Sequence, residues 1–152
     1  MTMSEKSGLP PCAAWVSPYL TVKDPSASIE FYERAFGFST RGSMPGPDGK
    51  IVHAGMNWND GVIMFGAEAA FGGTCRAPVT SGVESPIALY VYCDDVDALF
   101  ARATEAGAQA VLPPQNQFWG DRMCRLIDPD GYAWCFATHV GKAACAEELV
   151  QV

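Results

Sequence analysis

The chain has 152 residues, 49% of them hydrophobic, with a formal net charge of −7 and a sequence pI near 4.6. This length suffices for one globular domain with a sizeable core, while an acidic chain without a cluster of Lys and Arg argues against nucleic-acid or anionic-membrane partners. No apolar run approaches the ~20 residues that span a bilayer, and no apolar segment flanked by basic charge opens the chain, so we expect a cytoplasmic protein.

The first half of the chain predicts a strand, a helix and three further strands. A β-branched and aromatic run over residues 19–24 ends in an aspartate that can cap a helix. Pro25 suits the first turn of that helix, and Gly37 ends it. A Pro/Gly-rich loop at residues 45–49 and an Asp-Gly turn at residues 59–61 then separate three strands.

The second half repeats this plan after a linker. Residues 67–83 are rich in Gly, Thr, Ser and Ala, and 17 residues are many for a compact domain, so we expect the linker to be mobile or to cross to the other half or to a partner subunit. A strand at residues 90–95 again ends in an aspartate, a helix ends at Gly107, and Pro113-Pro114 and Asp130-Gly131 separate three strands.

Equivalent features recur at an offset of 70 or 71 residues. Gly61 and Gly131 are 70 positions apart, and the two capping residues Asp24 and Asp95 are 71 apart. We therefore interpret the chain as one β-α-β-β-β module written twice. The predicted boundaries are an N-terminal extension (1–13), a first module (14–66), a linker (67–83), a second module (84–139) and a C-terminal tail (140–152).

The six cysteines are widely spaced, and no pair forms Cys-x-x-Cys. A disulfide framework would require an oxidising environment, of which the sequence has no sign. We expect reduced thiols, with Cys93, Cys124 and Cys135 as small core residues on strands.

The repeated plan, the Asp-Pro-Asp-Gly turn and the segment 29–38 resemble the vicinal oxygen chelate superfamily of glyoxalase I, bleomycin-resistance proteins and extradiol dioxygenases, over roughly residues 14–139. Four further segments are similar to the PhnB-like branch of that superfamily: 17–20, 44–49, 118–122 and 137–139. The resemblance implies an α+β fold in which two β-α-β-β-β modules form an incomplete eight-stranded barrel with the helices outside. It also implies a homodimer, because a partner can cover the open sheet edges.

The superfamily's known chemistry depends on a divalent metal held by four His or Glu side chains on the concave face of the sheets. The resemblance places these positions on Ser17, His53, residues 86–88 and Cys135. Only His53 is a usual ligand, and Cys135 would have to be deprotonated by the metal. We expect a cavity without metal or cofactor. The alternative is one divalent ion on His53, Cys135 and a partner's residue, in a lyase, isomerase or dioxygenase.

Residues 118–122 are the strongest candidate for a binding site. Gly120 allows close backbone approach, Trp119 offers a flat apolar face with one N–H donor, and Arg122 provides a planar fork for a carboxylate or phosphate. The resemblance places this segment at the mouth of the concave sheet, so we expect Trp119 and Arg122 to share a cavity with His53. The alternative is a buried ion pair between Asp121 and Arg122, with Trp119 as core.

The predicted ligand is a small aromatic or anionic molecule, and the residues expected to bind it are His53, Trp119, Asp121, Arg122, Tyr19 and Tyr90. If the protein is instead an enzyme without metal, Asp121 and His53 are its candidate acid and base. His139 ends the last strand and is expected to be a surface or dimer-contact residue. Asp128 and Asp130 are explained by turn chemistry.

Overall fold

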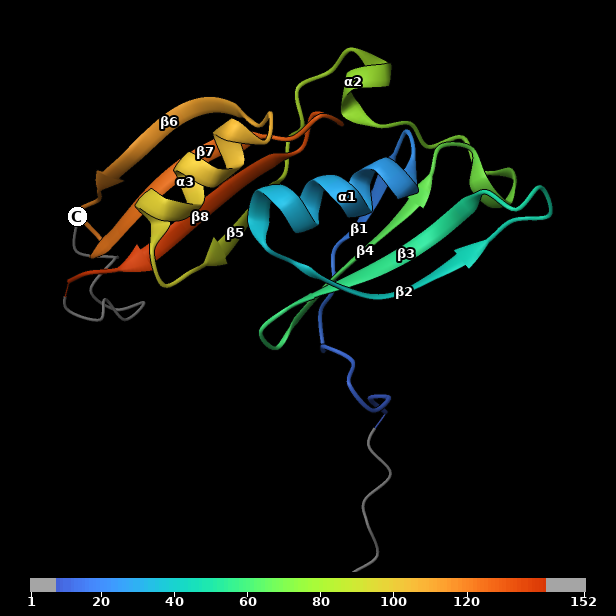
Figure 1. Ribbon diagram of the computed structural model, residues 1–152, viewed down its shortest axis with the longest axis horizontal. Coiled ribbons are helices and arrows are strands. Elements are labelled where there is room, and N and C mark those ends of the chain that lie inside the picture. The colour runs from blue at the N-terminus through green and yellow to red at the C-terminus, as the bar shows by residue number, and fades with distance from the viewer. Residues whose placement is uncertain (1–7, 142–152) are drawn as a thin grey trace, which may run out of the picture.

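The computed structural model describes residues 8–141 and confirms the α+β plan of two β-α-β-β-β modules (Figure 1). The first module comprises β1 (Tyr19–Val22), α1 (Pro25–Phe36), β2 (Ser39–Pro45), β3 (Ile51–Trp58) and β4 (Gly61–Ala67). Two short helices follow, η1 (Ala70–Gly72) and α2 (Pro78–Ser81). The second module comprises β5 (Ala88–Tyr92), α3 (Val96–Glu105), β6 (Gln109–Asn116), β7 (Asp121–Ile127) and β8 (Ala133–His139).

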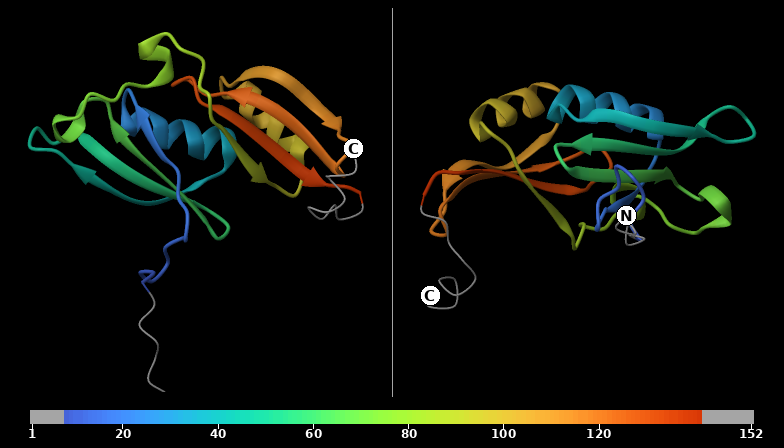
Figure 2. Two further views of the ribbon diagram at one scale, coloured as in Figure 1. Left: turned by 180° about the vertical axis from the view of Figure 1, so that it is seen from behind. Right: turned by 90° about the horizontal axis from the view of Figure 1, so that it is seen from below.

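Each module forms a four-stranded sheet, and both sheets have the same topology. The strand orders are β1-β4-β3-β2 and β5-β8-β7-β6, with the first strand of each module parallel to the last and the other pairs antiparallel. The two sheets remain separate, so the barrel is not closed (Figures 1 and 2). This shared topology is what a duplicated module requires.

The two long helices begin at the predicted caps. The side chain of Asp24 accepts a hydrogen bond from the N–H of Ser26, and that of Asp95 accepts one from the N–H of Ala98, both at 3.0 Å. Gly37 ends α1 in the left-handed region with a φ of 76°. Local sequence signals therefore account for where both helices start and where α1 stops.

The C-terminal ends of α1 and α3 meet, which joins the modules. Arg102 of α3 donates hydrogen bonds to the main-chain oxygens of Glu33 and Arg34, and Arg34 donates in return to that of Ala106. The last carbonyls of a helix have no partners within it, and cations are favourable there. Each helix thus supplies an arginine that satisfies the end of the other.

One hydrophobic core lies between the helices and the sheets and spans both modules. Trp134 and Phe136 of β8, in the second module, pack against Tyr32 and Phe36 of α1, in the first. Strand residues alternate between faces, so each sheet has a helix face that forms this core and an opposite open face. The open faces correspond to the concave face of the sequence prediction.

The Asp-Gly turns lie between the last two strands of their modules, as predicted, but they are not equivalent residue by residue. Gly131 lies in the loop between β7 and β8 with a φ of 94°, a conformation that favours glycine. Gly61 is instead the first residue of β4 and pairs with Trp58, and the left-handed position of that turn is taken by Asn59 with a φ of 51°.

The linker contacts the second module, and a crossing to the other half is one of the three outcomes expected for it. The N–H of Ala77 donates to the side chain of Glu68, and the N–H of Val79 in α2 donates to the main-chain oxygen of Asp130, both at 3.0 Å. Pro78 is buried against the loop that contains Gly131. The segment between the sheets is therefore attached at both ends.

Cys124 and Cys135 are small buried residues on strands, as expected, whereas Cys93 lies just after the end of β5. Cys124 is buried in the shared core, Cys135 is buried on the open face of the second sheet, and Cys93 is half-buried. The five cysteines between residues 8 and 141 are free thiols, and the sixth, Cys145, lies outside the described residues. Within the same part of the chain, no helix is long and apolar enough to cross a membrane.

Candidate functional site

On the open face of the first sheet, Tyr19 and His53 form a polar pair. The Tyr19 hydroxyl lies 3.1 Å from Nδ1 of His53, and the two rings stack with their centroids 5.5 Å apart. Tyr19 lies on β1 and His53 on β3, so the tyrosine ring must cross β4, which runs between them. It crosses over Gly66, where an added Cβ would lie 2.5 Å from the hydroxyl oxygen. Any side chain at position 66 would therefore prevent the contact between Tyr19 and His53.

A cavity of about 380 Å³ opens beside this pair and is lined entirely by residues between 13 and 64. Met44, Val62 and Met64 give it apolar walls, Arg41 and His53 supply a guanidinium and an imidazole, and two serines supply hydroxyls. The Arg41 side chain lies over Gly55, and its guanidinium donates to the main-chain oxygen of Cys12. The cavity thus combines an apolar wall with one cationic group and one imidazole.

On the open face of the second sheet, a buried carboxylate collects four side-chain partners. Asp121 is 1% exposed. Its Oδ2 accepts hydrogen bonds from the hydroxyls of Tyr90 and Tyr92, at 2.7 and 2.8 Å, and from Nε1 of Trp119 at 3.1 Å. Its Oδ1 lies 3.0 Å from Nδ1 of His139. Tyr90 and Tyr92 share a face because they are two residues apart on β5, and Asp121 and His139 are direct partners in the β7–β8 register.

The electrostatics of this cluster determine where its protons lie. Burial acts to raise the pKa of Asp121, but hydrogen bonds from its partners, led by His139, outweigh it and leave the pKa below the usual 3.8. Burial and the hydrogen bond to Asp121 raise the pKa of Tyr90, and the same hydrogen bond, followed by burial, raises that of Tyr92. At neutral pH both hydroxyls therefore donate to an ionised carboxylate.

A second cavity, of about 410 Å³, lies where the two modules meet. Trp58 and Asn59 of the first module line it together with Tyr92, Asp94 and His139 of the second. Nε1 of Trp58 donates a 2.8 Å hydrogen bond to the main-chain oxygen of Tyr92, which fixes the indole across the junction.

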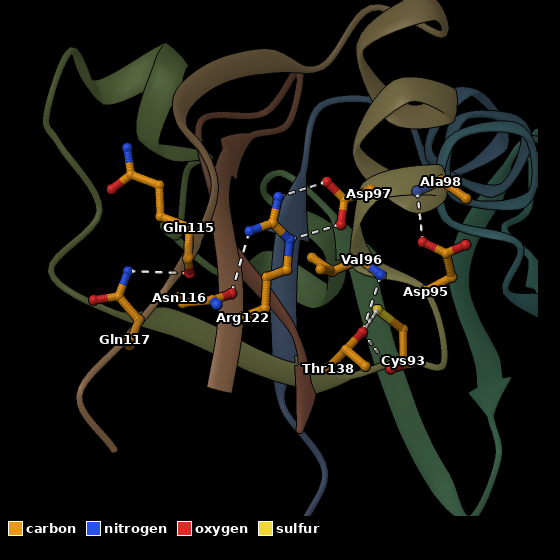
Figure 3. Close-up of polar contacts among 10 residues, drawn as sticks. All are labelled: Cys93, Asp95, Val96, Asp97, Ala98, Gln115, Asn116, Gln117, Arg122 and Thr138. Atoms are coloured by element: carbon orange, nitrogen blue, oxygen red, sulfur yellow. Dashed lines mark hydrogen bonds and ion pairs between the residues drawn. The ribbon is translucent and has the colours of Figure 1, made fainter. Parts of the chain in front are cut away.

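Arg122 does not share a cavity with Trp119 and His53, and this part of the sequence prediction is wrong. Its Nε lies 2.7 Å from Oδ2 of Asp97, and a second guanidinium nitrogen lies 2.9 Å from Oδ1, so the fork holds the carboxylate of an α3 residue (Figure 3). A third nitrogen donates to Asn116. Neighbouring residues of a strand face opposite ways, so Arg122 faces the helices while Asp121 faces the open side.

The alternative of a buried pair between Asp121 and Arg122 is wrong for the same reason, since each has other partners. The structure brings Tyr90, Trp119 and Asp121 together on the second sheet, and Tyr19 and His53 together on the first. Whether these residues bind a ligand stays a prediction.

Three further residues belong to these sites but were not among the predicted binding residues: His139, Arg41 and Tyr92. The hairpin register contained a signal for the first of them. Strand residues of β7 and β8 pair at equal distances from Asp130, which places Asp121 opposite His139. Arg41 gave no such signal, because a bulge near it shifts the pairing of β2 with β3.

The residues present do not fit the divalent metal of the resembled superfamily. Ser17 and His53 line the cavity of the first sheet, whereas Ala88 and Cys135 lie on the second. Burial raises the pKa of the Cys135 thiol, which disfavours the thiolate that a metal would need. Within residues 8–141, no three His, Cys, Asp or Glu side chains come together in a way that could hold a metal ion.

Known proteins resemble this chain in both sequence and structure. The family model of the Glyoxalase/Bleomycin resistance protein/Dioxygenase superfamily matches residues 12–136. An uncharacterized protein of Mycobacterium bovis is 38% identical over 121 residues, which are 78% of this chain and 79% of that protein. The crystal structure of TioX from Micromonospora sp. ML1 is similar with a TM-score of 0.68 and 29% identity, over 84% of this chain and 100% of that one. A bleomycin resistance determinant encoded on the transposon Tn5 has a similar fold, with a TM-score of 0.60 and 22% identity over 84% and 98% of the two chains.

Proposed function

Because this chain belongs to the Glyoxalase/Bleomycin resistance protein/Dioxygenase superfamily, we propose that it binds a small aromatic or anionic molecule, without a metal ion, on the open face of its first sheet. The observation that carries the proposal is the cavity of about 380 Å³ in which Arg41 and His53 adjoin apolar side chains. Ligand sites are commonly concave, mostly apolar and provided with a few polar groups that fix orientation.

The guanidinium of Arg41 and the imidazole of His53 favour an anion with an apolar body. A guanidinium offers a planar set of donors that matches a carboxylate, and methionine side chains adapt to the shape of an aromatic ring. Arg41 thereby takes the role that the sequence prediction gave to Arg122, whose fork is already occupied by Asp97. His53 is placed to add a hydrogen bond from the same cavity.

A titration with benzoate tests this proposal, because benzoate is an anion with an aromatic body and no donor of its own. Arg41→Gln should weaken its binding about tenfold or more, the loss expected when a hydrogen bond to a charged group disappears. Arg76→Gln is the matched control, since Arg76 lies in the exposed linker, away from both sheets' open-face sites, and donates to the neighbouring main-chain oxygen of Cys75.

Arg125→Gln tests whether benzoate binds on the second sheet instead. Arg125 is part of β7 and pairs with Cys135 on the open face of the second sheet. Loss of benzoate binding in Arg125→Gln, with Arg41→Gln unchanged, would move the ligand to the second sheet and contradict the proposal. Benzoate that binds all three variants equally would contradict an arginine-held anion.

We also propose a homodimer, in which a second copy covers the open faces. Several large side chains are exposed there, namely Tyr19, Met44, Tyr90 and Tyr92. An exposed apolar surface of this kind is typical of an interface. Sedimentation equilibrium should give about twice the chain mass of 16.3 kDa, and a monomer at micromolar concentration would contradict the assembly.

A further inference from the structure

We propose that the cavity between the modules is a second ligand site, separate from the one on the first sheet, and that it takes a neutral, weakly acidic aromatic molecule such as a phenol. The phenol would donate its hydroxyl proton to Nε2 of His139. Three features support this assignment: the state of the histidine, the carboxylate behind it and the lining of the cavity.

The state of His139 follows from its partner. Asp121 is ionised at neutral pH, because its hydrogen bonds leave its pKa below 3.8, and an ionised carboxylate can only accept hydrogen bonds. Nδ1 of His139, 3.0 Å from Oδ1, must therefore carry the proton. In the neutral ring Nε2 is then an acceptor. Among residues 8–141 the side chain of Asp121 is the one polar partner that the structure gives this ring.

The carboxylate behind the ring is held firmly. Two tyrosine hydroxyls and the indole N–H of Trp119 fix its other oxygen, so Asp121 cannot turn away from His139. If the proton moves from the phenol oxygen to Nε2, the products are a phenolate and an imidazolium, and the imidazolium keeps its Nδ1–H hydrogen bond to the carboxylate of Asp121. The transfer needs no other reactant.

The lining of the cavity selects a neutral aromatic ligand. Trp58 and Tyr92 supply aromatic side chains, and Trp58 is fixed by its hydrogen bond to the main chain of Tyr92. Asp94 also lines the cavity, and no Lys or Arg is among the lining residues described. A carboxylate without a neighbouring cation disfavours a ligand that arrives as an anion, whereas a phenolate formed inside the cavity has the protonated ring of His139 beside it; the first cavity has Arg41 instead. The two cavities therefore favour different ligands.

The test uses 4-nitrophenol, whose absorption differs between the phenol and the phenolate. Added at a pH where the free molecule is mostly protonated, it should bind the full chain and show increased phenolate absorption. His139→Gln should weaken binding about tenfold or more and abolish the increase, because the glutamine amide is not a base. The His139 side chain is 41% exposed, so this variant should fold, which a thermal melt verifies.

A spectroscopic measurement examines the histidine independently of any ligand. The chain has two histidines, so ¹⁵N spectra of the protein and of His53→Gln assign both imidazoles. His139 should carry its proton on Nδ1, and Asp121→Asn should abolish this preference because the amide can also donate.

Three results would overturn the proposal. The first is a neutral His139 with its proton on Nε2. The second is 4-nitrophenol binding that His139→Gln does not change. The third is binding that His53→Gln or Arg41→Gln abolishes and His139→Gln leaves intact, since the phenol would then occupy the cavity of the first sheet. Benzoate binding tests the first cavity alone, so failure of one proposal is distinguishable from failure of the other.

Discussion

The hydroxyl of Tyr32 donates a 2.6 Å hydrogen bond to Oδ2 of Asp128 and so joins α1 of the first module to the β7–β8 loop of the second. The same oxygen accepts from Nε1 of Trp134, while Oδ1 accepts from the N–H groups of Asp130 and Tyr132. Burial raises the pKa of Tyr32 well above its usual value, so the hydroxyl keeps its proton. One aspartate therefore both shapes a loop and fastens two modules together.

Tyr32→Phe should lower the free energy of unfolding by about 1.5–3 kcal/mol, because the buried Asp128 loses a hydrogen bond that water cannot replace. The melting temperature should fall by several degrees. Tyr19→Phe is the matched control, since its hydroxyl is on the exposed open face, and it should change stability little. Equal effects of the two substitutions would show that the bond between the modules adds no stability.

Asp121→Asn should reduce stability in a way that depends on pH. The folded-state pKa of Asp121 lies below 3.8, so its carboxylate stabilises the fold above that pH, and this contribution is lost as the pH falls through the folded-state value. At pH 7 the substitution should cost about 1–3 kcal/mol. The gap between the two proteins in urea unfolding should narrow below pH 3.8.

Asp60→Asn is the control for removal of one negative charge, because Asp60 lies in the exposed β3–β4 turn. A cost of Asp121→Asn that stays the same from pH 7 to pH 3 would show that the charge of the carboxylate is not what stabilises the fold.

The purified protein should carry well under one equivalent of Zn, Ni, Fe or Mn. Only His53 among the four positions inferred from the resemblance is a usual metal ligand, and a catalytic zinc site needs about three protein ligands. A chelator should therefore leave the melting temperature unchanged. Stoichiometric metal that His53→Ala removes would favour a lyase, isomerase or dioxygenase instead.

Gly131→Ala should destabilise the protein by more than about 1 kcal/mol, because Gly131 has a φ of 94° and an added Cβ would lie 3.0 Å from Pro78 and Val79. Gly61→Ala should cost less, since Gly61 is part of β4 and its added Cβ would meet one carbonyl oxygen at 3.2 Å. Thermal melts of the two variants make the comparison. Equal losses would contradict the different roles of the two glycines.

The fold was predictable because its signals are local and occur twice. Asp24 and Gly37 mark the ends of one helix, and the recurrence of the pattern identified the second module. The site was less predictable because it depends on which way each strand residue faces. Trp119, Asp121 and Arg122 are close in sequence, yet the third turns to the helix face.

The position of the linker also could not be predicted from local sequence patterns. Its composition predicted mobility as readily as a crossing. What attaches α2 is a main-chain hydrogen bond from Val79 to Asp130 and the burial of Pro78 against Gly131, and these partners lie in a loop more than 50 residues later in the chain. Contacts of this kind depend on the packing of whole modules, which short patterns do not encode.

The shared core lies on the helix faces of both sheets, and most side chains of the open faces lie outside it. After a gene duplication, open-face residues outside the hydrogen-bonded cluster around Asp121 can be replaced one at a time with little loss of stability. Tyr19 and Tyr90 illustrate such divergence, because they occupy equivalent positions in the first strands of the two modules. Tyr19 pairs with Met64 of β4 and contacts a histidine. Tyr90 pairs with Cys135 of β8 and contacts a carboxylate. A scaffold organised in this way is well suited to evolve new specificities, by natural drift or by laboratory selection.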